Sequence, residues 1–158
     1  MISWVYDPMT FQTRAENIGE VQAEGVEFEL EQKLGEKGKG YVNYTYQRAI
    51  NKKLAVDKTI PYTPQTKYNA GIMFEDAAVL VRNVGTRYID SQNTISLPGY
   101  TVVDMRISRK IGKTTVELSV NNLFDERYSE AMGLDLSFNL RGYPMPGRSY
   151  LLGMKWEF

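Results

Sequence analysis

The chain has 158 residues with 19 basic and 19 acidic side chains, and it contains neither histidine nor cysteine. This composition excludes a disulfide framework, a thiolate metal site and most hydrolase and zinc-enzyme chemistry, and the interspersed charges lack the basic stripe expected of a nucleic-acid partner. No run approaches the roughly 20 apolar residues of a membrane-spanning helix, so a helical membrane protein is excluded and a membrane β-barrel is not.

The start of the chain predicts one weak strand. Residues 2–8 form a short apolar segment that ends at Pro8. No charged segment followed by an apolar run precedes it, so Met1 does not open a signal peptide.

Apolar residues then follow a period of two, which is typical of strands with unlike faces. The first clear case sets Val26, Phe28 and Leu30 against Glu27, Glu29 and Glu31. The same parity recurs in later segments, whose apolar members are Val42, Tyr44, Tyr46; Tyr68, Ala70, Ile72, Phe74; Thr101, Val103, Met105, Ile107; Val116, Leu118, Val120; and Tyr150, Leu152, Met154, Trp156, Phe158.

The segment from Ala77 to Ile89 predicts a further strand whose facing the pattern does not assign. Arg82 interrupts one parity and Asn83 interrupts the other. The total is about eight strands, and no segment has a convincing helical period. The expected fold is therefore all-β, antiparallel and up-and-down.

Connections between these strands alternate in length. The short ones are Gly35–Gly40, Glu75–Asp76 and Ile111–Lys113, whereas the long ones cover residues 51–64, 90–98 and 125–146. Tight turns at one rim and long loops at the other are typical of outer-membrane barrels, and strands of about ten residues are long enough to cross a bilayer.

Two interpretations of the alternation remain open at this point. A soluble β-sandwich or barrel that binds a ligand would place the apolar parity in its core, whereas a membrane barrel would turn it to lipid. Tyrosines near strand ends favour the membrane barrel. Ionisable groups within the strands suit either a lumen or a solvated face; they are Glu27, Glu29, Asp104, Arg106, Glu117 and Lys155.

Motifs near the end of the chain resemble a known family. The segments Asn121–Tyr128 and Tyr143–Arg148, with the terminal aromatic strand, are similar to the C-terminal end of TonB-dependent outer-membrane receptors. Gly25–Glu29 resembles the family's glycine-glutamate strand, and Ile60–Pro64 resembles its entry from loop to strand. The similarity spans nearly the whole chain.

This resemblance implies a fold and a function. Such receptors bind ferric siderophores or cobalamin at extracellular loops and import them through a 22-stranded barrel that an N-terminal domain plugs. We therefore expect residues 1–158 to be the C-terminal part of such a barrel, without plug domain or signal peptide, in the Gram-negative outer membrane. TonB would act only through N-terminal parts absent here, and neither enzymatic activity nor a cofactor is expected.

The family's motif residues are the expected site residues, whereas the motifs assign no ligand-binding residue. They are Asn122, Leu123, Phe124, Asp125, Pro146, Gly147, Arg148, Gly153, Trp156 and Phe158. The last three resemble the signal read by the barrel-assembly machinery, although position 151 holds leucine where that signal usually has a polar residue. With two unpaired edges in lipid, we expect the chain to close as eight strands or to pair edges in an oligomer.

Overall fold

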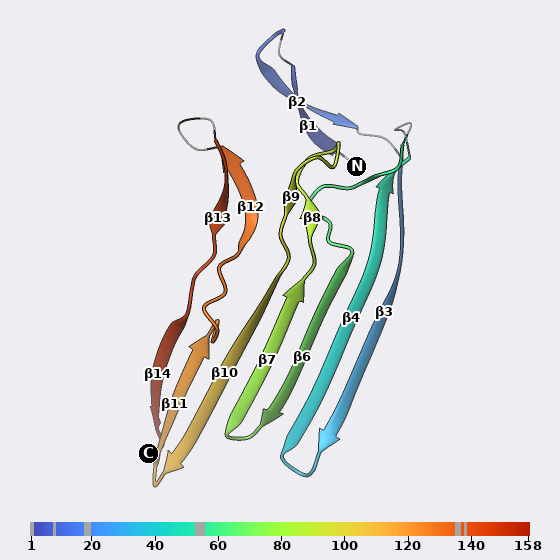
Figure 1. Ribbon diagram of the computed structural model, residues 1–158. Coiled ribbons are helices and arrows are strands. Elements are labelled where there is room, and N and C mark those ends of the chain that lie inside the picture. The colour runs from blue at the N-terminus through green and yellow to red at the C-terminus, as the bar shows by residue number, and fades with distance from the viewer. Residues whose placement is uncertain (1, 8, 18–19, 53–55, 135–136, 138) are drawn as a thin grey trace.

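The computed structural model describes residues 2–7, 9–17, 20–52, 56–134, 137 and 139–158 (Figure 1). Seven antiparallel strands form the main sheet in the order β14-β11-β10-β7-β6-β4-β3, with short β5 beside β4. The bounds in chain order are β3 Val21–Leu34, β4 Gly38–Asn51, β5 Lys58–Thr59, β6 Thr66–Phe74, β7 Ala77–Val84, β10 Tyr100–Ile111, β11 Thr114–Asn121 and β14 Ser149–Trp156.

Three separate two-stranded hairpins accompany the main sheet. They are β1 with β2 (Ile2–Asp7 and Gln12–Asn17), β8 with β9 (Arg87–Tyr88 and Ser96–Leu97), and β12 with β13 (Ser129–Leu134 and Leu140–Pro144). All three lie at the end of the sheet opposite the short turns (Figure 1). We call these two ends the loop end and the turn end.

The register produces the two faces that the alternation predicts. Directly opposed residues of antiparallel strands point to the same side. One such row runs Leu30, Val42, Ala70, Val81, Val103 across five strands. The neighbouring row runs Glu29, Asn43, Asn69, Arg82, Val102 on the opposite side. The sheet therefore has one apolar face and one polar face.

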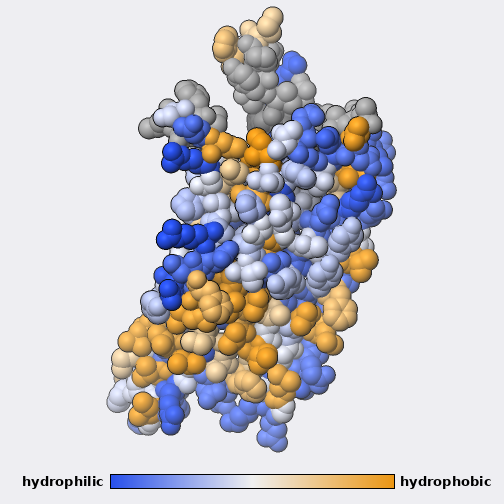
Figure 2. Space-filling view, viewed as in Figure 1, coloured by the Kyte–Doolittle hydropathy of each residue, from blue (hydrophilic) through white to orange (hydrophobic). Residues whose placement is uncertain are grey.

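Most of the apolar face is exposed, although Ile50 and Val120 on the same parity are only 4% exposed. Exposed fractions reach 68% for Leu152 and 74% for Met154, and no described side chain is fully buried. Hydrophobic residues gather over the turn-end half of the strands in Figure 2, with polar residues beyond them at both ends. The described residues include no helix long and apolar enough to cross a membrane.

The polar face carries the ionisable groups expected there. Arg106 pairs with Glu117 at 3.4 Å, and Lys39 pairs with Glu31 at 3.4 Å, in each case between adjacent strands. Both pairs are partly exposed, so each contributes at most about 1 kcal/mol.

The structure assigns the facing of the strand at 77–89. Val79 and Val81 join the apolar face, opposite Met105 and Val103, and Arg82 joins the polar face. Asn83 lies on the apolar parity at the loop end, where its side chain donates to Thr101 Oγ1 at 2.9 Å. The strand is eight residues long because the chain leaves the sheet after Val84.

The first strand lies elsewhere than expected, and the sheet is open. Residues 2–7 do form a strand, but β1 pairs with β2 and does not join the meander. The sheet is also open, since β3 and β14 are its edges and do not pair with each other. The single chain thus does not close as eight strands, and pairing of these edges in an oligomer stays a prediction.

Candidate functional site

The turn after β11 is built around Asn122. Its side chain is buried, with 4% exposed, and its Nδ2 donates to Glu126 O at 2.9 Å while its Oδ1 accepts Glu126 N–H at 2.8 Å. The amide thus pairs with both backbone groups of Glu126, as a neighbouring strand would. Asn122 has a φ of 52°, which asparagine tolerates better than most residues.

This turn also binds the segment that precedes β14. Asp125 Oδ1 accepts the N–H of Arg148 at 2.9 Å, and Asn122 Nδ2 donates to Pro146 O at 3.3 Å. A Cβ at Gly147 would lie 2.7 Å from Asp125 Oδ1, so only glycine fits without displacing that carboxylate. Both sequence motifs therefore form one unit, the loop clamp: Asn122, Asp125, Pro146, Gly147 and Arg148.

A residue of β10 completes the clamp. Asp104 Oδ1 accepts the N–H of Asn122 at 2.8 Å, and the N–H of Leu123 donates to Val103 O at 2.7 Å. The sequence predicted Asp104 only as a polar-face group. The alternation along β10 indicated which face Asp104 belongs to. It could not indicate the hydrogen bond to Asn122, because that residue lies 18 positions later in the chain.

The remaining motif residues are divided between the two ends of the sheet. Leu123 and Phe124 belong to the clamp turn, where Phe124 is 74% exposed. Gly153, Trp156 and Phe158 lie toward the turn end, where Trp156 pairs with Thr114 (Figure 1). The structure therefore does not bring all the motif residues together.

Gly153 has no steric requirement in the folded sheet. A Cβ at this position would meet only Glu117 Cβ, at 4.0 Å, which is ordinary van der Waals contact. This distinguishes Gly153 from Gly147, whose missing Cβ the clamp needs.

The β12–β13 hairpin is fastened at its base by a second network. Arg87 is buried, with 6% exposed, and its Nη2 donates to Ser129 O at 3.4 Å and to Glu130 O at 3.1 Å. Tyr100 OH donates to Glu130 Oε1 at 2.6 Å, and the rings of Tyr100 and Tyr128 lie 4.1 Å apart. We call Arg87, Tyr100, Tyr128 and Glu130 the hairpin anchor.

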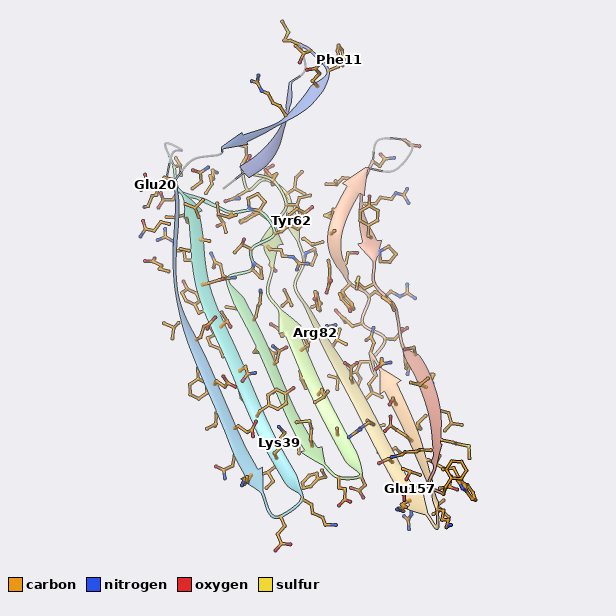
Figure 3. All side chains as sticks on the ribbon, turned by 180° about the vertical axis from the view of Figure 1, so that it is seen from behind. Phe11, Glu20, Lys39, Tyr62, Arg82 and Glu157 are labelled. Carbon is orange, nitrogen blue, oxygen red and sulfur yellow. The ribbon has the colours of Figure 1, made fainter. Side chains whose placement is uncertain are left out.

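Three further features mark the anchor. Arg82, labelled near the middle of the sheet in Figure 3, donates from Nη2 to Tyr128 OH at 3.2 Å. Arg87 Nη1 is buried and has no hydrogen-bond partner within the described part of the chain. The Arg87 guanidinium lies 5.9 Å from the centre of the Tyr100 ring, within the range of a cation–π contact.

The other long loops are joined to each other. Asn93, with a φ of 57°, accepts the N–H of Thr59 on Oδ1 at 2.7 Å and donates to Thr59 O at 2.9 Å, so its amide extends β5 as a strand partner would. Asp90 closes this loop, because its carboxylate accepts the N–H of Thr94 at 3.0 Å and that of Ile95 at 2.8 Å.

The hydrogen bonds of this loop change the acidity of Asp90. Chiefly the bond from Thr94 N–H, with those from Ile95 N–H and Thr94 Oγ1, stabilises the charged carboxylate. Together they lower the pKa of Asp90 to about 2.

A cavity of about 630 Å³ lies between the clamp, the hairpin and the connection that enters β10. Leu97, Pro98 and Gly99 form one wall, and Tyr128, Ser129 and Met132 form part of the other. The described residues hold no group of three or more Asp or Glu side chains placed to bind a metal ion.

Comparison with known proteins shows the family of the chain. A family model described as "TonB dependent receptor-like, beta-barrel" matches residues 1–123. The ferrioxamine B receptor of Salmonella typhimurium is 30% identical over 159 aligned positions, which cover 90% of this chain and 22% of the relative. The ferrioxamine receptor of Yersinia enterocolitica is 28% identical and covers 78% of this chain and 19% of the relative.

Solved structures share the fold. The ferric yersiniabactin uptake receptor FyuA from Yersinia pestis matches with a TM-score of 0.74 at 20% identity, over 89% of this chain and 24% of that one. The copper transporter OprC matches with a TM-score of 0.74 at 22% identity, over 99% and 26%. The chain thus spans about a fifth to about a quarter of the length of these proteins.

Proposed function

Because the chain belongs to the family of TonB-dependent receptor β-barrels, which are transporters of the Gram-negative outer membrane and not enzymes, we propose that it forms part of a receptor for a ferric siderophore. Membership in this family also excludes the alternative of a soluble ligand-binding β-sandwich. The import activity belongs to a whole receptor, of which these residues would be the C-terminal portion of the barrel.

One observation carries the proposed ligand class. The Salmonella and Yersinia relatives described above are named for ferrioxamine, and the identity of 30% to the Salmonella receptor extends over 90% of this chain. Ferrioxamine is a ferric hydroxamate, so this chelate class is the first to test. The relatives named above include no cobalamin receptor, and the copper transporter is similar at a level that indicates the fold alone.

The two faces of the sheet would then have different surroundings. Lipid would meet the apolar face, and the polar face would line the barrel interior, with Arg82 and the hairpin anchor at its loop end. The siderophore would enter from this end because the long connections gather there. TonB would be reached only through parts of the receptor outside these residues.

A chimeric receptor tests the proposal. This chain replaces the corresponding C-terminal segment of the Salmonella ferrioxamine B receptor, in a strain that lacks its own ferrioxamine receptor. We expect energy-dependent uptake of radioactive iron from ferrioxamine B and no uptake of vitamin B12 or of copper ions. Uptake of vitamin B12, or of copper without the chelate, would contradict the siderophore assignment.

The matched control separates assembly from function. Heat-modifiable migration on gels shows whether the chimera has folded in the outer membrane, and the unmodified Salmonella receptor sets the reference uptake. A folded chimera that binds no ferrioxamine would defeat the proposed ligand.

A further inference from the structure

We propose that the cavity beside the loop clamp is a subsite for the ferric hydroxamate, and that Arg87 is the positioning residue that sets its width. This inference rests on the proposed function for its ligand. Its geometric part, the role of Arg87, stands on the structure of the loop end alone.

Arg87 connects the two walls of the cavity. Its backbone pairs with Leu97 in the β8–β9 hairpin, and Leu97 forms one wall. Its side chain binds the carbonyl oxygens of Ser129 and Glu130 at 3.4 and 3.1 Å, and Ser129 forms part of the opposite wall. A single residue therefore fixes the distance between two loops 42 positions apart in the chain.

Burial makes this connection rigid. With 6% of Arg87 exposed, its bonds to the two carbonyls face no competition from bulk water. Both carbonyls accept from the same guanidinium nitrogen, Nη2, and the guanidinium also lies 5.9 Å from the centre of the Tyr100 ring. Tyr100 supports the same wall through its bond to Glu130 at 2.6 Å.

The lining suits a chelate of low net charge. Apolar surface comes from Leu97, Pro98, Met132 and Met145, whereas Arg127 and Tyr128 offer polar groups. Acidic Asp125 and Glu126 also line the cavity, and basic Arg127 and the buried Arg87 behind its walls balance their charge. A mostly apolar cavity of about 630 Å³ with a few polar groups is typical of small-molecule sites.

The first test measures the width of the cavity without any ligand. Because the chain has no cysteine, spin labels at Ser96→Cys and Ala131→Cys report the distance between β9 and β12 in the chimeric receptor. We expect Arg87→Gln to broaden this distance distribution, and Arg87→Lys to give an intermediate width. Arg109→Gln, an exposed arginine at the turn end, is the matched control. An unchanged distribution in Arg87→Gln would overturn the positioning role.

The second test measures ligand affinity in the folded chimera at low temperature, where binding occurs without transport. We expect Met145→Trp, which fills the cavity, and Arg87→Gln each to weaken ferrioxamine B binding about fivefold or more. Met105→Trp on the apolar face is the volume-matched control and should leave binding unchanged. Normal affinity in Met145→Trp would overturn the subsite.

The two measurements keep the hypotheses apart. If the parent chimera folds but binds no ferrioxamine, the proposed ligand and the proposed subsite are both wrong. The distance measurement still tests the positioning role of Arg87 in that case. If ferrioxamine binds normally to every variant while the distance broadens in Arg87→Gln, the positioning role holds and the subsite falls.

Discussion

Asp125 accepts the backbone N–H of Arg148 at 2.9 Å, although the two residues are 23 positions apart in the chain. The bond closes the base of the last long connection, so the β12–β13 hairpin rises from a fixed point beside β11 and β14. A long loop with a closed base loses much less entropy on ordering its remaining residues.

Removal of this bond should destabilise the loop end. Asp125→Ala leaves the N–H of Arg148 without its charged acceptor, and we expect a loss of about 1–3 kcal/mol in the free energy of unfolding. Urea denaturation in detergent micelles measures the change. Glu126→Ala is the control because Glu126 joins the clamp through its backbone. Equal stability of both variants would contradict the clamp's contribution.

Gly147→Ala should reproduce this effect by a different route. Its Cβ would lie 2.7 Å from Asp125 Oδ1, so the carboxylate must move away from Arg148. We expect a loss of about 1–2 kcal/mol. In the Asp125→Ala background the same substitution should cost much less, since the clash is gone, and a double-mutant cycle tests this. Additive costs would show that Gly147 acts independently of Asp125.

Gly153 and Phe158 should matter for assembly more than for stability. Gly153 has space for a Cβ, and Phe158 is fully exposed. Gly153→Ala and Phe158→Ala should therefore change the free energy of unfolding by about 0.5 kcal/mol or less. If these residues form part of the assembly signal, both variants should insert less receptor into the outer membrane of cells. Normal cellular insertion would count against that signal.

Spin labels test which face meets lipid. Met105 and Arg106 are neighbours on β10 but belong to opposite faces. A label at 105 should be accessible to a lipid-soluble relaxation agent, and a label at 106 to a water-soluble one. Similar accessibility at both positions would defeat the assignment of the faces.

The loop closed by Asp90 should resist acid. The pKa of Asp90 is lowered from 3.8 to about 2, so its stabilising effect is fully present above pH 3.8 and disappears as the pH falls through about 2. A spin label at Ser91 should gain mobility with a midpoint near that lower pH, whereas Asp90→Asn should show no such transition. A midpoint near pH 4 would mean that the hydrogen bonds to Thr94 and Ile95 do not stabilise the carboxylate.

The alternation of apolar and polar residues predicted most strands of the main sheet. The resemblance, the all-β class and the outer-membrane location are confirmed by the family match, and the apolar parities of residues 26–30 and 42–46 share one face as expected. A period of two is a property of neighbouring residues, so sequence alone reveals it. At residues 77–84 the pattern was ambiguous, because Asn83 is a polar residue on the apolar parity.

Long-range contacts explain what the sequence did not predict. No local pattern indicates that Asp104 holds Asn122, or that Arg87 holds Ser129, because these partners lie 18 and 42 positions apart. The hairpin anchor consists of ordinary tyrosine, arginine and glutamate residues without a motif. The place of β1 was missed because pairing with β2, and not its own composition, keeps it out of the meander.

The polar pair Asn83–Thr101 on the apolar face also has a consequence for the bilayer. On β10 the residues of this face beyond Thr101 are Val103, Met105, Ile107, Arg109 and Ile111. The stretch from Val103 to Ile111 covers about 26 Å along the strand, or about 20 Å along the membrane normal at a tilt of about 40°. Hydrocarbon of roughly this thickness, thinner than an average bilayer, would place Asn83 and Thr101 among the outer head groups. Arg109 would then lie about 5 Å inside the inner boundary, where its long side chain could extend to the inner head groups.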